Sequence, residues 1–243
     1  MAEDVTTRPH VLIVGASSGI GASVASRMLD THQVTALARR IDRLELLQAA
    51  GADVRFCDVA DFESIPTVVE AAVAAQGKID CLIYCAGVQM IKPMRSLKTN
   101  DIESVITVNL TAALVFARLI ASQRISSSDS VFCAVSSIAA HRPEPAIIPY
   151  SVAKAGLEAM IKGMARELAP RRAVGVAPGW LETEMTGAFK AVYSETFKEE
   201  LAKKAPRGIA TVDAVTDLIE FLVSPKAGYI TGQIVTIDGG ASL

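Results

Sequence analysis

VLIVGASSGIG, residues 11–21, decides the fold class because an apolar run passes directly into a glycine-rich turn. Val11–Val14 contains no polar residue, which is typical of a parallel strand buried on both faces. Gly15, Gly19 and Gly21 follow it, and a helical pattern comes next. Glycines let a backbone turn tightly and approach a ligand closely, and a helix N-terminus offers free N–H groups to an anion. The stretch therefore predicts a strand–loop–helix unit that binds phosphate.

The same alternation continues along the whole chain. We expect strands at 11–14, 34–38, 53–59, 79–87, 130–137, 173–179 and 233–240, and helices at 20–29, 42–52, 62–76, 99–123 and 150–168. This order predicts one α/β domain over residues 1–243, a Rossmann-like, doubly wound, parallel seven-stranded sheet with helices on both faces. Residues 1–9 are expected to be a flexible tail. The charged segment 182–205 is too long for a simple turn and is expected to form a substrate lid.

Composition narrows the class of protein. The chain has 243 residues, 51% of them hydrophobic but only 5% aromatic, and a net charge of −2. That charge provides no basic footprint for nucleic acid. The four cysteines and three histidines lack metal-ligand spacing, so we expect no metal, and the cysteines are interpreted as small buried hydrophobic residues. With no export signal and no apolar run of membrane-spanning length, we expect a cytoplasmic protein without a membrane partner.

The residues after the second strand favour one nicotinamide cofactor. In an open parallel sheet, a dinucleotide lies beyond the carboxyl ends of the strands, and an acidic residue after the second strand would bind the ribose 2′-hydroxyl. This chain instead places Arg39 and Arg40 there, in VTALARRIDRL. Guanidinium groups pair well with phosphate, and Ser18 is a further possible donor. We therefore expect NADP(H) rather than NAD(H); a solvated basic turn is the alternative.

Tyr150 and Lys154 lie four residues apart in YSVAK, so a helix places them on one face. A free tyrosine has a pKa near 10, and a nearby ammonium together with the positive ring of an oxidised nicotinamide stabilises the phenolate, so we expect the pKa of Tyr150 to be lowered. Such a phenol donates a proton to a carbonyl oxygen or accepts one from an alcohol, and a serine at the preceding strand end adds a second hydrogen bond. Behind a glycine loop, this pair indicates an oxidoreductase.

Taken together, these motifs resemble those of the short-chain dehydrogenase/reductase family over about residues 11–240. GASSGIG resembles its cofactor loop, CDV its adenine turn, CAG its Asn-Ala-Gly stretch and PGWLET the loop that meets the nicotinamide. The resemblance implies cofactor contacts from Gly15, Ser17, Ser18, Gly19, Ile20, Gly21, Arg39, Arg40, Asp58, Val59, Cys85, Ala86, Gly87, Tyr150, Lys154, Pro178, Gly179 and Thr183. It implies catalysis by Asn109, Ser137, Tyr150 and Lys154.

The resemblance also assigns roles within that set. The family serine lies thirteen positions before its tyrosine, which selects Ser137 and leaves Ser136 as a structural residue at the strand end. Asn109 would hold a water between Lys154 and bulk solvent, although a satisfied buried amide is the alternative. The chain departs from the family pattern at Val14, where threonine is usual, and at Cys85, where asparagine is usual. Both departures concern support of the cofactor rather than proton transfer.

Within the family, LAPRRAVGVAPGWLETEMT and GYITGQIVTIDGG are similar to segments of 3-oxoacyl-(acyl-carrier-protein) reductases. That similarity implies reduction of a 3-oxoacyl thioester by NADPH, with an acyl carrier protein as a possible partner if Arg171 and Arg172 supply a positive rim. Val88, Trp180 and Met185 are expected to line the substrate side with Ser137 and Tyr150. Their apolar character suits an acyl chain or a compact hydrophobic ketone. Because the lid is longer than in the reductases that the chain resembles, a ketoreductase or secondary-alcohol dehydrogenase of specialised metabolism, with a bulkier hydrophobic substrate, is the alternative. A cofactor-binding sensor without catalysis is a third interpretation.

The family resemblance also implies a homotetramer. The helices expected at 100–123 and 150–168 would form one of its interfaces. The apolar composition agrees with buried subunit surfaces.

Overall fold

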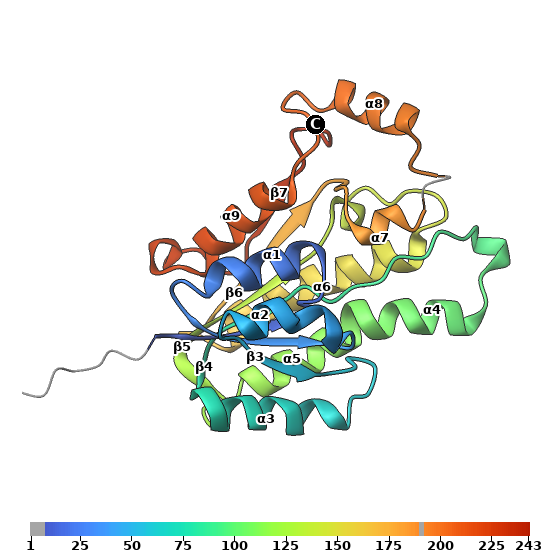
Figure 1. Cartoon of the computed structure of the whole chain (residues 1–243). Coiled ribbons are helices and arrows are strands. Elements are labelled where there is room, and N and C mark those ends of the chain that lie inside the picture. The colour runs from blue at the N-terminus through green and yellow to red at the C-terminus, as the bar shows by residue number, and fades with distance from the viewer. Residues whose placement is uncertain (1–7, 190–191) are drawn as a thin grey trace, which may run out of the picture.

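The computed structural model describes residues 8–189 and 192–243, and its centre is a parallel sheet of seven strands (Figure 1). The strands are β1 (His10–Val14), β2 (Gln33–Ala38), β3 (Asp53–Phe56), β4 (Ile79–Tyr84), β5 (Ser126–Val135), β6 (Arg172–Pro178) and β7 (Ile234–Ile237). They lie in the order β3-β2-β1-β4-β5-β6-β7, and every neighbouring pair is parallel. The predicted doubly wound seven-stranded sheet is confirmed.

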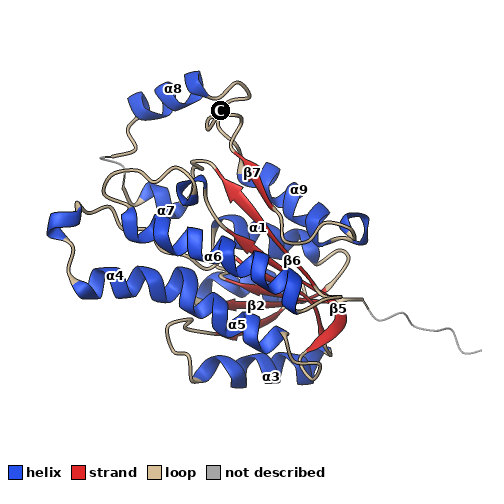
Figure 2. Cartoon of the chain, turned by 180° about the vertical axis from the view of Figure 1, so that it is seen from behind, coloured by secondary structure: helices blue, strands red, loops and turns tan. Residues whose placement is uncertain are grey.

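Helices cover both faces of the sheet (Figures 1 and 2). One face is packed by α3 (Ser64–Gln76), α5 (Ala112–Ile120) and α6 (Ile148–Glu167), the other by α1 (Gly19–Met28), α2 (Glu45–Ala49) and α9 (Val212–Val223). Alternate residues of β1 enter the two cores, Leu12 one and Ile13 the other. This two-sided burial is why the strand sequences are apolar without alternation.

The sheet reverses its order of winding between β1 and β4, and the two strands end side by side. Val14 pairs with Tyr84, and the Cys85 amide donates to the Val14 carbonyl at 2.8 Å. The turns that begin at Gly15 and Cys85 therefore leave the sheet at one edge. In doubly wound folds this edge is where a ligand binds.

The helix expected at 99–123 is continuous in direction but not regular. It consists of α4 (Thr99–Ile106), a π-helical turn (Thr107–Thr111) and α5. The turn contains Asn109, whose side-chain Nδ2 donates to the Val105 carbonyl at 2.9 Å. An asparagine side chain competes for helical backbone groups, and π-turns of this kind occur often at functional sites.

By length and composition alone, Thr99–Ile120 would be able to cross a membrane, although the sequence predicts no apolar run of that length. Helices packed into a protein core have the same length and composition. Here Val105, Ala112 and Phe116 are buried, and α5 packs against the sheet.

The expected lid, residues 182–205, contains two helices. The short α7 (Glu184–Gly187) follows β6 closely, and α8 (Glu195–Lys204) stands away from the body of the sheet (Figure 1). Residues 190 and 191 lie outside the described residues, as do residues 1–7 of the expected tail. β5 begins at Ser126, earlier than the strand expected at 130–137.

Candidate active site

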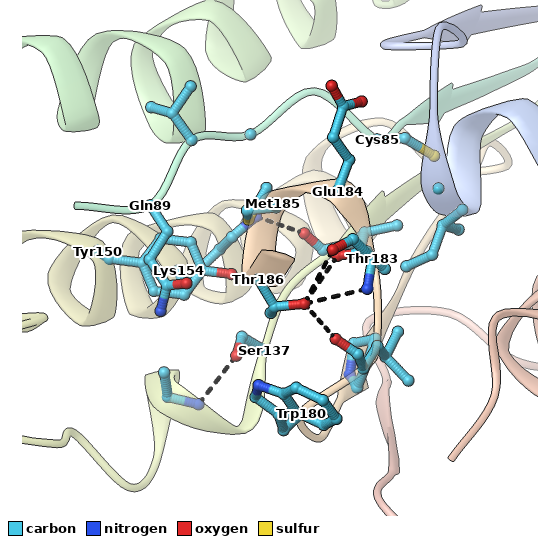
Figure 3. A pocket seen from close by; sticks show the side chains of 18 of the residues that line it. Cys85, Gln89, Ser137, Tyr150, Lys154, Trp180, Thr183, Glu184, Met185 and Thr186 are labelled. Atoms are coloured by element: carbon cyan, nitrogen blue, oxygen red, sulfur yellow. Dashed lines mark hydrogen bonds between the residues drawn. The ribbon is translucent and has the colours of Figure 1, made fainter. Parts of the chain in front are cut away.

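A cleft of about 750 Å³ opens at the carboxyl ends of the strands, over the point where β1 and β4 separate. Figure 3 shows Tyr150 and Lys154 on one helix, Ser137 on the segment after β5, and Trp180 and Thr183 on the segment after β6. The cleft is lined by all the expected cofactor and substrate residues except Asp58. Asn109 lies behind the lining, fully buried.

The turn of the glycine loop has no space for side chains. Its bare backbone can therefore approach a dinucleotide closely. A Cβ atom on Gly21 would lie 2.3 Å from the Gly15 carbonyl oxygen, and one on Gly15 would lie 2.7 Å from the Ala86 amide nitrogen. Gly15 also has a φ of +91°, which favours glycine. A Cβ atom on Gly19 would have the Thr183 side chain as its nearest neighbour, at 3.8 Å, so the backbone there faces the cleft. α1 begins at this glycine and directs its N-terminus into the cleft.

Arg39 and Arg40 follow β2 and line the same cleft. Arg40 Nη2 donates to the hydroxyl oxygens of Ser17 (3.1 Å) and Ser18 (3.0 Å). Its Nη1 donates to the Glu184 carboxylate at 2.6 Å. Arg39 is exposed to solvent. The site therefore offers cationic groups where an adenosine ribose carries its 2′ substituent.

The Tyr150 hydroxyl faces the cleft and is close to Ser137. Burial raises the pKa of Tyr150 to about 12, and a hydrogen bond with the Ser137 side chain opposes that rise. Among the protein groups, loss of water around the phenol outweighs the stabilising groups, whereas the expected lowering depends also on the positive ring of an oxidised nicotinamide. Ser137 also accepts from the Ala139 amide at 3.2 Å, which fixes its hydroxyl oxygen at the strand end. At neutral pH the phenol holds its proton.

Lys154 lies one helical turn after Tyr150 and is 4% exposed. Its Nζ donates to the Val135 carbonyl at 2.7 Å and lies 5.5 Å from the centre of the Tyr150 ring. Burial lowers the pKa of Lys154 to about 8. The ammonium is therefore charged at neutral pH and is held close to the phenol.

Asn109 points its amide towards the same region. Its Nδ2 donates to the carbonyls of Val88 (2.8 Å) and Val105 (2.9 Å). Its Oδ1 is buried and has no hydrogen-bond partner among the described residues. A Cβ on Gly87 would approach that Oδ1 to 2.9 Å and the Lys154 Nζ to 3.7 Å. The unpartnered acceptor thus lies on the same side as the Lys154 ammonium, and only the donor half of the amide is satisfied.

Ser136, the strand-end serine that the sequence leaves to structure, is buried in the wall of the cleft. Its hydroxyl donates to the Glu158 carboxylate at 2.7 Å. The other Glu158 oxygen lies 2.8 Å from His141 Nε2. Glu158 lies one turn beyond Lys154 on α6 and is 4% exposed. This contact ties the segment after β5 to the helix that carries Tyr150.

The outer wall of the cleft is aromatic. Trp180, Tyr193 and Phe197 pack against one another with ring centres 5.2–5.9 Å apart. The Tyr193 hydroxyl accepts from Gln89 Nε2 at 3.1 Å, which joins the lid to the segment after β4. Sequence reasoning identified Trp180 but missed Tyr193, Phe197 and Gln89. The four-residue spacing of the two lid aromatics was the available signal.

Two expected residues, Asp58 and Cys85, have environments that differ from their motifs. Asp58 accepts from the Ala60 amide at 3.0 Å and shapes the turn, while its neighbours Cys57 and Val59 line the cleft. Burial raises the pKa of the Cys85 thiol to about 12, so this residue fills space beside the cofactor loop as an uncharged group.

Arg171 and Arg172 do not form a rim around the cleft. Arg172 is the first residue of β6. The other end of this strand, Pro178, lies at the site, about 20 Å from Arg172. The Arg172 guanidinium donates to four backbone carbonyls, among them Leu222 (2.9 Å) and Ile230 (3.1 Å). Arg171 Nε donates to Ser126 at 3.1 Å. The expectation that these two arginines form a positive rim for an acyl carrier protein is therefore wrong, because both support the opposite end of the strands.

A family model described as enoyl-(acyl carrier protein) reductase matches residues 15–242. The chain belongs to the short-chain dehydrogenase/reductase family. A 3-oxoacyl-(acyl-carrier-protein) reductase from Thermotoga maritima is 32% identical over 94% of this chain and 96% of its own. An uncharacterized oxidoreductase from the same organism is 31% identical over 96% of this chain and 95% of its own.

Solved structures show the same likeness. Actinorhodin polyketide ketoreductase with NADPH superposes with a TM-score of 0.88 at 25% identity, covering 96% of this chain and 97% of the other. A gluconate 5-dehydrogenase from Burkholderia cenocepacia, in complex with NADP and tartrate, gives 0.87 at 26% identity over 96% and 95% of the two chains. This short-chain dehydrogenase/reductase is an oxidoreductase of the ketone–alcohol type with an NAD(P)-binding fold.

Proposed function

We propose that the protein reduces a 3-oxoacyl thioester to its secondary alcohol with NADPH, through Tyr150. The observation that carries the proposal is the convergence of Tyr150, Ser137 and Lys154 at the carboxyl edge of the sheet, beside the glycine loop. The 32% identical 3-oxoacyl reductase supports the choice of substrate.

The nicotinamide, when bound, supplies the hydride. As negative charge gathers on the carbonyl oxygen, the Tyr150 hydroxyl donates its proton and the Ser137 hydroxyl gives a second hydrogen bond. A pKa of about 12 keeps that proton on the phenol until the oxygen becomes basic. The Lys154 ammonium, held by the Val135 carbonyl at 2.7 Å, stabilises the phenolate left behind. Asn109, with its free Oδ1 beside Lys154, is placed to hold a water that returns the proton from solvent.

The residues fit a dinucleotide at the glycine loop, and the arginines favour its phosphorylated form. Gly15, Gly19 and Gly21 would let the backbone approach the pyrophosphate. Arg39 and Arg40 would bind the 2′-phosphate with Ser18, while Val59 would contact the adenine. Thr183 lies close to Gly19. Together with Pro178 and Gly179, it would contact the nicotinamide end of the cofactor.

The alternative is a ketoreductase or secondary-alcohol dehydrogenase for a bulkier hydrophobic substrate. The aromatic wall of Trp180, Tyr193 and Phe197 favours it, as does the likeness to a polyketide ketoreductase. Val88 and Met185 complete the apolar lining on either side of Tyr150. The segment 182–205 would then act as the substrate lid.

The assembly is also a proposal. Exposed Leu114 on α5 and Val152 on α6 give these two helices apolar outer surfaces, which supports the expected homotetramer. The cytoplasmic location and an acyl carrier protein as partner remain predictions from the sequence.

The test is NADPH oxidation with an acetoacetyl thioester beside a panel of bicyclic and aryl ketones. Turnover of the thioester with the higher kcat/KM supports the first proposal. Turnover of the ketones alone replaces it with the alternative. Cofactor binding without turnover of any ketone would favour the sensor interpretation.

A further inference from the structure

Glu184 is an acidic residue at the cofactor end of the cleft that neither the motifs nor the proposed chemistry uses. It is the first residue of α7 and directly follows Thr183. One carboxylate oxygen accepts from Arg40 Nη1 at 2.6 Å and the other from Arg43 Nη1 at 2.7 Å. Hydrogen bonds from Arg40 and then Arg43 lower the pKa of Glu184, so it is ionised at neutral pH.

The contact joins two parts of the site that are distant in sequence. Arg40 and Arg43 follow β2, whereas Glu184 belongs to the segment after β6. Arg40 reaches the glycine loop with Nη2, through Ser17 and Ser18, and the lid with Nη1, through Glu184. One guanidinium therefore connects the cofactor loop to α7.

The same guanidinium is a donor for two competing anions. A 2′-phosphate carries more negative charge than a carboxylate and takes the same planar donors. While Glu184 holds Arg40 and Arg43, part of their positive charge is already neutralised. A second anion in this place also meets repulsion from the Glu184 carboxylate.

We propose that Glu184 determines cofactor specificity: it competes with the 2′-phosphate for Arg40 and lowers the preference for NADP(H) over NAD(H). The inference rests on the proposed function, in which Arg39 and Arg40 receive that phosphate. Because NAD(H) has no 2′-phosphate, it binds with the Arg40–Glu184–Arg43 contact intact. Binding of NADP(H) exchanges Glu184 for phosphate at Arg40 and frees α7 from that side.

The experiment compares wild type with Glu184→Gln and with a matched control, Glu182→Gln. Glu182 also lies in the lid segment but pairs with Lys198 rather than with an arginine that follows β2. The dissociation constants of NADP⁺ and NAD⁺ are measured by calorimetry, without a substrate. The fluorescence of Trp180, the chain's one tryptophan, gives a second reading at the base of the lid.

Glu184→Gln should tighten NADP⁺ binding by about two- to fivefold, the range of exposed ion pairs, and leave NAD⁺ binding unchanged. The gain should shrink at 0.5 M salt, about three times the physiological ionic strength, because the charges are exposed. Glu182→Gln should change neither dissociation constant.

Weaker NADP⁺ binding by Glu184→Gln would overturn the inference, because Glu184 would then orient Arg40 for the phosphate. Equal effects of the two variants would also overturn it, since the charge rather than the contact would be responsible. If wild type prefers NAD⁺, the proposed NADP(H) dependence fails instead. The change in the NADP⁺/NAD⁺ ratio in Glu184→Gln still tests the role of Glu184.

Discussion

The ammonium of Lys154 lies 5.5 Å from the centre of the Tyr150 ring and donates its hydrogen bond to the Val135 carbonyl. Lys154 thus acts on the phenol through its charge, while a backbone group fixes its position. Burial moves the two pKa values in opposite directions, to about 8 for Lys154 and about 12 for Tyr150. As pH rises, the lysine loses its charge well before the tyrosine loses its proton.

We expect kcat/KM for ketone reduction to be constant from pH 6 to about pH 8 and to fall above it, as Lys154 deprotonates. The sign follows from the lowered pKa: the charged form is present below about 8 and absent above. The measurement is a pH profile of kcat/KM with the ketone. In Lys154→Arg the charge persists, so its lower activity should show no break near pH 8. A break in that variant would assign the titration to another group.

Tyr150→Phe removes the proton donor and should lower kcat/KM by about 10²- to 10⁴-fold. Calorimetric binding of NADP⁺ should stay within about threefold of wild type, because the ring remains. Tyr229→Phe is the matched control, since Tyr229 is fully exposed, and it should leave kcat/KM unchanged. Activity of Tyr150→Phe near that of wild type would remove the phenol from the mechanism.

The succession of strands and helices along the chain and the place of the site could be predicted from sequence, since both follow from local patterns. Apolar runs ended by glycine mark the strands, and motifs at their carboxyl ends must meet at one edge. The Arg40–Glu184 contact and the aromatic wall could not be predicted in this way. They depend on how residues 182–205 fold back over the cleft, and no local spacing specifies that path.

The pKa of Tyr150 shows a second limit of sequence reasoning. The pattern YSVAK identifies the neighbouring charge but says nothing of how much water the phenol loses. Likewise, Arg171 and Arg172 are adjacent to a site motif in sequence, yet they lie at the opposite end of β6. Position along a strand, rather than distance along the chain, decides which charges reach the site.

The glycine loop offers a matched pair of substitutions. Gly21→Ala would place a Cβ 2.3 Å from the Gly15 carbonyl oxygen, so we expect a loss of about 1–3 kcal/mol in stability and weaker binding of both NADP⁺ and NAD⁺. Gly163→Ala, on α6, meets no atom within 4 Å and should stabilise the protein by about 0.5–1 kcal/mol. Urea unfolding measures the stability of both variants, and cofactor titration measures their binding of NADP⁺ and NAD⁺. Unchanged cofactor binding by a folded Gly21→Ala would show that the pyrophosphate lies elsewhere.

Glu158 should support the site through Ser136 rather than through the substrate. Its buried carboxylate accepts from Ser136 at 2.7 Å and lies 2.8 Å from His141 Nε2. Glu158→Ala would leave the buried Ser136 hydroxyl with only the longer contact to the Lys154 carbonyl, at 3.4 Å, so we expect the free energy of unfolding to fall by about 1–3 kcal/mol. The control is Glu167→Ala, an exposed position at the end of the same helix, which should change stability by less than about 0.5 kcal/mol.

The same variant separates support from catalysis. Because Ser136 precedes Ser137 directly, loss of its anchor should lower kcat for the ketone more than it changes the dissociation constant of NADP⁺. Glu158→Gln keeps an acceptor oxygen for Ser136 and should recover most of the lost stability and kcat. Urea unfolding gives the first quantity and steady-state kinetics the second. If Glu158→Gln were as damaged as Glu158→Ala, the negative charge facing His141, rather than the hydrogen bond to Ser136, would be the property that the site needs.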